Sequence, residues 1–325
     1  MSSEVPANLE SRDMGTSALP GRDVLEIGVI RSLSQRSDLR GASRAVTHLF
    51  IMLLTGTLVY FAMPHWYLLI PAMILHGFTI VTMFAPMHEC VHRTAFDHRM
   101  INEIFGWFAG LISFYNFTFY RYYHTWHHRY TQIPDKDPEL MEPKPRNRFE
   151  YFLEISGIWY WVPRPWIFLK LALGMTKSFP FIPEKARKSV ALSAALQLAV
   201  YIAGIVSIAM GYMAVWYYWF LPAILAQPFL RAFTLAEHTA CTLDENGLTN
   251  TRTTLTIFPV RLMMWNMPFH TEHHLYPSIP FFRLPQAHEE IKNSLAHLSP
   301  SYAAAHREIF RHLTLEDRTK EPVHS

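Results

Sequence analysis

The amino-acid sequence predicts an all-α integral membrane protein in which four transmembrane helices form two hairpins. Two stretches without Asp, Glu, Lys or Arg carry this prediction, residues 45–88 and 189–230. Each is about twice the roughly 20 apolar residues that one membrane-spanning helix requires. Only 17% of the residues are charged, against about 25% in soluble domains. A soluble α-helical protein of 325 residues would have difficulty burying two such stretches, so we disfavour that alternative.

A turn signal lies near the middle of each stretch. Met63-Pro64-His65-Trp66 interrupts the first stretch and Gly211-Tyr212 the second, and Pro and Gly favour tight turns. Aromatic residues near these turns suit the boundary between lipid and water. We therefore expect transmembrane helices at about 45–63, 67–86, 190–210 and 213–229.

The positive charges determine the expected orientation. All 29 Lys and Arg lie outside the two uncharged stretches, and two hairpins place the segments that carry them on one side of the membrane. Lys and Arg are enriched on the cytoplasmic side, so we expect a cytoplasmic cap. Segments 101–119 and 151–182 are rich in aromatic residues but interrupted by charge, Gly or Pro. They are expected to be interfacial helices, or alternatively walls of a substrate tunnel.

The domain organisation is expected to be simple. Residues 1–25 show no signal peptide and are expected to be a disordered tail, 26–300 a single membrane domain, and 301–325 a polar C-terminal tail. The formal net charge of +3 does not indicate a nucleic-acid partner. Two cysteines exclude a disulfide scaffold and a Cys-ligated iron–sulfur cluster. Cys90 and Cys241 are expected to be small packing residues.

Half of the 18 histidines fall into a pattern. Eight lie in three runs: His88-Glu89-Cys90-Val91-His92, His124-Thr125-Trp126-His127-His128 and His270-Thr271-Glu272-His273-His274. His238 stands apart, after the fourth expected transmembrane helix. On a helix, residues i, i+3 and i+4 share a face, so each run would present its imidazoles together on the cytoplasmic side.

This pattern predicts a centre with two metals. Imidazole is the commonest protein ligand of metals, and a tetrahedral zinc takes at most four ligands, so nine converging histidines indicate two metals. The predicted ligands are His88, His92, His124, His127, His128, His238, His270, His273 and His274. The other nine are expected to be polar residues near the membrane surface: His48, His65, His76, His98, His288, His297, His306, His312 and His324.

Acidic residues beside these ligands have two interpretations. Glu89, Glu237 and Glu272 would either accept a hydrogen bond from the second nitrogen of a ligand imidazole or lie on the solvated surface. Asp135, Asp137 and Glu139 follow the second run and are expected to be surface charge, with contact to a ligand imidazole as the less favoured alternative. The run His88–His92 also matches the HExxH pattern of zinc proteases. That alternative leaves the two HxxHH runs unexplained.

The order of these features resembles that of the membrane fatty-acid desaturase/hydroxylase family, over about residues 40–290. The family has two spans, two histidine boxes, two further spans and a third box, and its ninth histidine matches His238. In acyl-CoA desaturases of the family, an Asn four residues before that histidine reaches one metal through water, and here Thr234 takes its place. The runs 236–238, 250–254, 265–270 and 272–277 are similar to a bacterial branch that includes rhizobitoxine-type desaturases, with carotenoid ketolases and hydroxylases nearby.

The resemblance implies an O2-dependent, non-haem di-iron desaturase of the bacterial inner membrane, with its active site on the cytoplasmic face. Its substrate would be a fatty-acyl chain or a related molecule such as an amino-acid enol ether. The first alternative is a hydroxylase or ketolase on the same scaffold, and an alternative of another class is a non-catalytic metal-binding membrane protein.

An external electron donor is also implied, because the chain has no haem domain and no Gly-rich nucleotide motif. We expect a ferredoxin or cytochrome-type donor with its reductase. Five basic residues are docking candidates, although ordinary juxtamembrane charge is the favoured interpretation: Arg121, Arg129, Lys144, Arg146 and Arg148.

Overall fold

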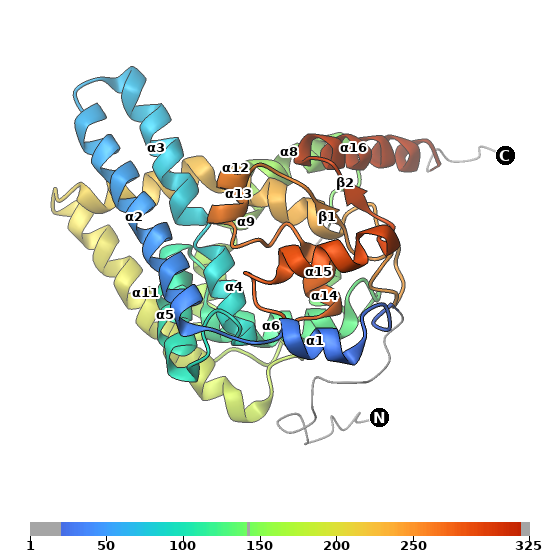
Figure 1. Ribbon diagram of the computed structural model, residues 1–325. Coiled ribbons are helices and arrows are strands. Elements are labelled where there is room, and N and C mark those ends of the chain that lie inside the picture. Colours follow the sequence, from blue (N-terminus) through green and yellow to red (C-terminus); the bar gives the residue numbers. More distant parts are fainter. Residues whose placement is uncertain (1–20, 142–143, 320–325) are drawn as a thin grey trace.

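The computed structural model describes residues 21–141 and 144–319, and this part of the chain is mostly helical (Figure 1). Four helical segments in it are long and apolar enough to cross a membrane: Asp38–Ala62, Trp66–His92, Glu184–Ala209 and Trp216–His238. The structure therefore confirms the predicted all-α class and the four apolar helices. Each segment extends beyond the expected bounds at the end that adjoins charged residues, because helical structure continues into those residues, and the fourth segment begins at Trp216 and not at 213.

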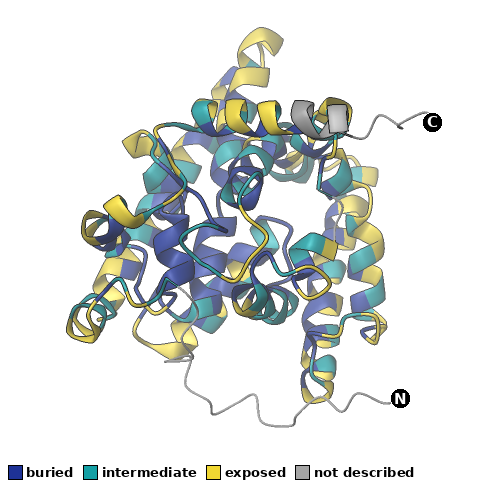
Figure 2. Ribbon diagram, turned by 90° about the vertical axis from the view of Figure 1, so that its right-hand side faces the viewer, coloured by how far each residue is buried: buried dark blue, intermediate teal, exposed yellow. Residues whose placement is uncertain are grey.

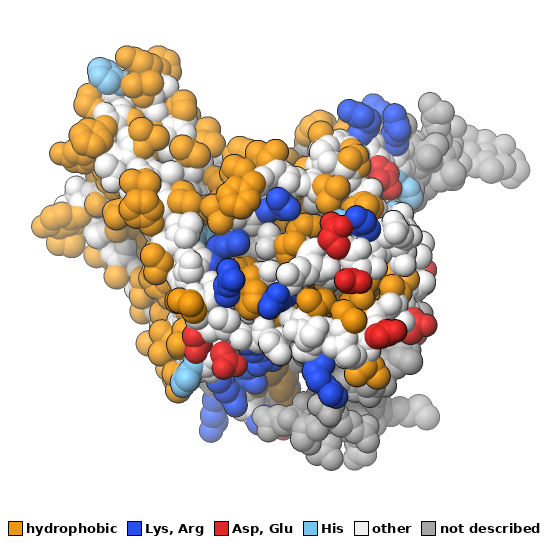
Figure 3. Space-filling view, viewed as in Figure 1, with side chains coloured by type: hydrophobic (Ala, Val, Ile, Leu, Met, Phe, Trp, Pro, Cys, Tyr) orange, Lys and Arg blue, Asp and Glu red, His pale blue; other side chains and the backbone are white. Residues whose placement is uncertain are grey.

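The first two apolar segments pack against each other and against the fourth. Helix α2 (Asp38–Ala62) lies against α3 (Trp66–Val81), and α3 lies against α12 (Leu221–His238). Gly77 permits the second contact, because a Cβ atom there would lie 1.9 Å from the carbonyl oxygen of Pro222. Hydrophobic side chains cover the surface around α2 and α3, whereas charged side chains are found over the rest of that face (Figure 3). Such an apolar surface suits contact with lipid.

Short helices extend or connect these segments, and those at Phe84–His92 and Glu184–Ala186 form the end of the second and the start of the third segment. They are α4 (Phe84–His92), α5 (Arg99–Ile112), α6 (Phe117–Tyr130), α7 (Pro138–Met141), α8 (Arg148–Ser156), α9 (Ile158–Trp161), α10 (Arg164–Ala172) and η1 (Glu184–Ala186). Helix α10 packs against α11 (Arg187–Ala209). Phe114, Tyr115 and Phe117, from a segment expected at the interface, are buried in the largest hydrophobic cluster. Their packing makes them part of the core.

The C-terminal third returns across the same core. It contains η2 (Trp216–Phe220), α13 (Phe258–Met263), α14 (His270–Leu275), α15 (Leu284–Ile291) and η3 (Lys292–Ser294). Strands β1 (Thr253–Thr254) and β2 (Leu298–Ser299) form a short parallel pair. Buried residues gather in the middle of the molecule, and exposed residues lie along the outer faces of the peripheral helices (Figure 2).

The two predicted tails lie partly outside the described residues. Within the described part, Leu25 is buried and its backbone N–H donates to the Tyr276 hydroxyl at 3.0 Å, just before α1 (Ile27–Leu33). At the other end, α16 (Tyr302–Thr319) packs against α12. Ala305 and Ile309 are buried against Ala236 because they recur at helical spacing on one face.

Three histidines expected at the membrane surface are instead buried. His48 on α2 holds its Nε2 2.9 Å from the Thr79 carbonyl oxygen, and its Nδ1 accepts from the Trp265 indole N–H at 3.2 Å. The Nδ1 of His76 lies 2.9 Å from the Thr55 hydroxyl. His288 is also buried, beside Glu272. These expectations were wrong because helix–helix contacts inside the bundle satisfy the polar atoms of the imidazoles.

Candidate metal centre

Four helices deliver the predicted ligand histidines to one buried region. Helix α4 carries His88 and His92, α6 carries His124, His127 and His128, α12 ends at His238, and α14 carries His270, His273 and His274. All are buried except His92, which is partly exposed. The structure thus brings together all nine histidines that the sequence singled out.

Side-chain caps hold two of these helices in place. The Asn116 Oδ1 accepts the backbone N–H of Phe119 at 2.8 Å and begins α6, while its amide donates to Gln197 on α11 at 2.7 Å. The buried guanidinium of Arg252 donates to the carbonyl oxygens of Ala236 and Thr239, at 2.8 and 2.7 Å. A cation at a helix C-terminus satisfies the last carbonyl groups, so Arg252 helps to fix the end of α12.

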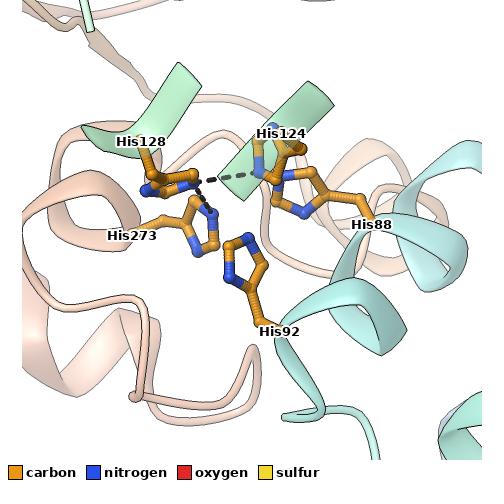
Figure 4. Close-up of side chains that lie close together, drawn as sticks. All are labelled: His88, His92, His124, His128 and His273. Carbon is orange, nitrogen blue, oxygen red and sulfur yellow. Dashed lines mark hydrogen bonds between the residues drawn. The ribbon is translucent and has the colours of Figure 1, made fainter. Parts of the chain in front are cut away.

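Five histidines form the first histidine cluster, shown in Figure 4: His88, His92, His124, His128 and His273. Their potential ligand atoms all lie within 4.8 Å of one another. The Nε2 of His128 lies 2.9 Å from that of His124 and 3.1 Å from that of His273. The rings of His88 and His92 enter from α4 on the other side of this group (Figure 4).

Four histidines form the second histidine cluster: His127, His238, His270 and His274. The Nε2 of His238 lies 3.3 Å from that of His127 and 3.1 Å from that of His270. The rings of His128 and His274 stack with centroids 4.1 Å apart and an interplanar angle of 9°. The two clusters are therefore adjacent and share this stacked pair as a wall.

The spacing of these nitrogens fits metal ligation. Two imidazoles on one metal, at about 2.1 Å with bond angles of about 90–110°, hold their nitrogens about 3.0–3.4 Å apart. Several other imidazole nitrogens are buried without a hydrogen-bond partner among the residues that the structure describes, including both nitrogens of His88, Nε2 of His92 and Nε2 of His274. Buried polar atoms are normally paired, and a metal in each cluster would pair them.

Burial keeps most of these imidazoles in the form that binds metal. It lowers the pKa of His124, His128, His270, His273 and His274 well below the usual histidine range. A neutral imidazole has a free lone pair for a metal. His127 differs. Burial alone would lower its pKa, but Glu139 and Asp137 together outweigh that effect and the pKa is raised.

In three of these rings, Nδ1 lies within hydrogen-bond distance of an oxygen atom. The Nδ1 of His127 lies 2.9 Å from Asp137 Oδ1, that of His238 lies 3.2 Å from the Asn250 carbonyl oxygen, and that of His274 lies 3.2 Å from the Thr131 hydroxyl. A proton on Nδ1 leaves Nε2 free for a metal. Asp137 was expected to be surface charge. That expectation was wrong, because the loop after α6 turns back and buries this carboxylate.

Two of the three glutamates beside ligand histidines are bound by other groups. Glu272 is buried and lies 2.5 Å from the Thr253 hydroxyl and 2.5 Å from Nδ1 of His288. Glu89 is also buried and accepts from the Thr94 hydroxyl at 2.8 Å and the Phe281 backbone N–H at 3.3 Å. Neither is solvated surface charge. Both instead attach the histidine-bearing helices to neighbouring segments.

Two cavities reach the clusters. One of about 150 Å³ borders His88, His124 and His270, and aromatic side chains including Tyr115 and Tyr120 line it. Its other lining residues include six charged ones: Glu139, Lys144, Glu154, Arg164, Arg231 and Glu237. We call it the substrate cavity. A second cavity of about 240 Å³ borders His128 and His274 and is lined by Arg22 and Arg129.

The residues that support the histidines could hardly be predicted from the sequence. Asp137, Thr131 and His288 belong to no recognisable spacing pattern, and their roles depend on how loops fold back onto α6 and α14. Thr234, which replaces the family's Asn, donates to the carbonyl oxygen of Leu230 on its own helix at 3.2 Å.

Comparisons with known proteins agree with the geometry. The model of the family described as fatty acid desaturase matches residues 33–306. The chain is 28% identical over 295 residues to the sn-1 oleoyl-lipid 12-desaturase of Picosynechococcus sp., covering 84% of this chain and 82% of that protein. It is 25% identical over 313 residues to the chloroplastic omega-6 fatty acid desaturase of Arabidopsis thaliana, covering 90% of this chain and 65% of that protein.

Proposed function

Because this chain belongs to the fatty acid desaturase family, we propose that it introduces a C=C bond into a fatty-acyl chain, using two irons held by the nine clustered histidines. Family membership makes the chain a metal-dependent, O2-using oxidoreductase, and its apolar helices place it in a membrane. The observation that carries the proposal is the pair of adjacent clusters of buried imidazoles, with nitrogens about 3 Å apart, beside an aromatic-lined cavity.

The overall reaction balances with an external donor. The metal centre, when loaded, supplies the oxidation of an unactivated C–H bond with O2. A –CH2–CH2– unit, O2, two electrons and two protons give –CH=CH– and two water molecules. The electrons must come from a separate protein, for which we propose a ferredoxin or cytochrome-type donor with its reductase.

The residues of this chain prepare the site for that chemistry. Asp137 and the Asn250 carbonyl accept from Nδ1 of His127 and His238 and so direct Nε2 of each ring into the second cluster. Tyr120 stacks on His124, with an interplanar angle of 12°, where the substrate cavity meets the first cluster. Tyr115 and Phe84 lie beside it and provide apolar contacts for a hydrocarbon chain.

The membrane orientation belongs to the same proposal. The four apolar helices form two hairpins that leave the histidine clusters on the cytoplasmic face, because every Lys and Arg lies outside the two uncharged stretches. A cytoplasmic donor would then reach the centre directly. In a bacterial inner membrane, that is the side on which reduced ferredoxins and cytochrome-type donors are available.

The charged lining of the substrate cavity favours a second candidate substrate. Lys144, Arg164 and the Arg231–Glu154 ion pair would suit a small polar substrate such as an amino-acid enol ether. The zinc-protease alternative receives less support. Its general base would be Glu89, but that carboxylate is bound to Thr94 and to the Phe281 backbone.

Expression in a host with known lipids tests the proposal. We expect about two irons per purified chain, and new alkenes in lipids or polar metabolites that contain no 18O from 18O2. Incorporated 18O would indicate the hydroxylase or ketolase alternative. His124→Ala should abolish turnover, whereas His98→Ala, at an exposed histidine outside the clusters, should not. Full activity of the His124 variant, or a wild-type protein without iron, would refute the proposed centre.

A further inference from the structure

The carboxylate of Glu237 points at the second histidine cluster. Glu237 is the penultimate residue of α12 and directly precedes His238. Its Oε2 lies 3.5 Å from Nε2 of His270, and only 12% of its side chain is exposed. It also lines the substrate cavity beside His270. This side chain therefore approaches the nitrogen of His270 that faces into the cluster.

Among the side chains that the structure describes, in residues 21–141 and 144–313, no hydrogen bond reaches the carboxylate of Glu237. Oε2 of Glu89 accepts from two groups, although its Oε1 is buried without a partner, and each carboxylate oxygen of Glu272 has one partner. All three glutamates sit next to a proposed ligand in the sequence. A buried carboxylate without a partner is costly. A cation in the second cluster would remove that cost for Glu237.

The distance is that expected between two ligands of one metal. Ligand atoms at about 2.0–2.2 Å from a metal, separated by about 90–110°, lie about 3.0–3.5 Å apart. Glu237 Oε2 and His270 Nε2 are 3.5 Å apart, which is the upper limit of this range. The separations of Nε2 of His238 from those of His127 and His270, 3.3 and 3.1 Å, fall within it.

The two clusters also differ in charge. Asp137 contacts His127 in the second cluster, and Glu139 Oε1 lies 3.7 Å from Nε2 of the same ring. In the first cluster all five candidate ligands are imidazoles, and Glu89, the acidic neighbour on α4, is bound elsewhere. Carboxylate oxygens are hard ligands, unlike imidazole. The two metal positions would therefore be chemically different.

We propose that Glu237 is an oxygen ligand of the metal in the second histidine cluster, so that this metal has mixed nitrogen and oxygen ligands while the other has nitrogen ligands alone. The inference rests on the metal centre of the proposed function. It concerns the composition of one of the two sites and not the reaction that the enzyme performs.

Titration of the purified, metal-free full chain with Co2+ tests this inference without any need for turnover. The wild type should bind two equivalents and give two sets of visible bands. Glu237→Ala should retain the binding and bands of the first cluster, with affinity for the second equivalent lower by at least tenfold. Glu237→Asp should lose less affinity than Glu237→Ala, and Glu290→Gln, at an exposed glutamate, should behave as the wild type.

The midpoint of thermal unfolding of the same metal-free proteins serves as the control for correct folding. Glu237→Gln keeps the shape of the side chain and removes its charge, so its metal-free form should unfold no earlier than the wild type while its second site is weakened. Two equivalents bound by Glu237→Ala with unchanged affinity and unchanged bands would overturn the inference. That outcome would leave the proposed desaturase standing, whereas a wild type that binds two Co2+ but never makes an alkene would refute only the proposed function.

Discussion

Asp137 Oδ1 lies 2.9 Å from Nδ1 of His127, and both side chains are buried. Asp137 also accepts the backbone N–H of Gln132 through Oδ2 at 2.7 Å and that of Glu139 through Oδ1 at 2.9 Å. Burial alone would raise the pKa of Asp137, but His127 and these backbone groups outweigh it and lower the pKa. The carboxylate thus folds the loop after α6 and orients one imidazole of the second histidine cluster.

We expect Asp137→Asn to weaken metal binding at the second cluster. The amide cannot accept from every group that Asp137 now binds, and it removes the negative charge beside His127. Loss of such an outer partner typically costs about 10–100-fold in metal affinity, which competition with a chelator measures. Asp135→Asn is the matched control, because Asp135 is exposed and its positive φ of 63° is one that Asn tolerates. Equal affinities in the two variants would contradict the role of Asp137.

His288→Ala should destabilise the region around α14. It would remove a partner from the buried carboxylate of Glu272, which lies between two predicted ligands in the sequence. A hydrogen bond to a charged group contributes about 1.5–3 kcal/mol. Thermal unfolding of the purified protein should show this loss, and His288→Asn should recover part of it, because its amide can donate from a similar position. His98→Ala, at an exposed site, should change stability by less than about 0.5 kcal/mol. A His288→Ala variant as stable as this control would argue against the pairing.

The metal-free protein should lose stability as the pH falls below about 6.5, the usual pKa of histidine. Burial holds the pKa of His124, His128, His270, His273 and His274 well below that value, so these rings stay neutral in the folded state and become protonated on unfolding. The unfolded state then binds more protons, and each ring contributes up to about 1.4 kcal/mol per pH unit.

His127 acts in the opposite direction, because a raised pKa stabilises the folded state below about pH 6.5 and loses that effect as the pH rises through the folded pKa. Five rings outweigh one, so the midpoint of thermal unfolding should fall from pH 7.5 through 6.5 to 5.5. A midpoint that stays constant or rises over this range would show that the rings are not held neutral.

Arg129→Ala should weaken the use of the electron donor. Arg129 is exposed at the end of α6, follows His128 and lines the cavity that borders both clusters. Among the other basic residues considered for docking, Arg121 is paired with Glu103 and Arg146 with Glu150. One exposed charge contributes up to about 1 kcal/mol, so we expect the KM for the donor to rise about fivefold. Turnover driven by peroxide should not change, and neither should any property of Arg36→Ala. An equal loss with peroxide would place the effect at the centre itself.

The class of the protein and the identity of the clustered histidines follow from the amino-acid sequence. The two uncharged stretches predict helices that cross a membrane, because no other structure satisfies its backbone hydrogen bonds in lipid so simply. The repeated spacing of His88–His92, His124–His128 and His270–His274 predicts shared helix faces, and the structure keeps the i, i+4 pair of each run in one cluster. Both inferences depend only on local periodicity and composition.

The division of the histidines between the two clusters depends on the three-dimensional packing of the helices. His127 and His128 are adjacent on α6 and therefore point about 100° apart, so one faces the cluster that includes α12 and the other the cluster that includes α4. The partners of the acidic residues also depend on the tertiary structure. Glu89, Glu237 and Glu272 look alike in the sequence, yet neighbouring segments supply donors to the first and the third and leave Glu237 facing the second cluster. Apart from Thr94, these partners come from other segments of the chain, and local patterns carry no information about them.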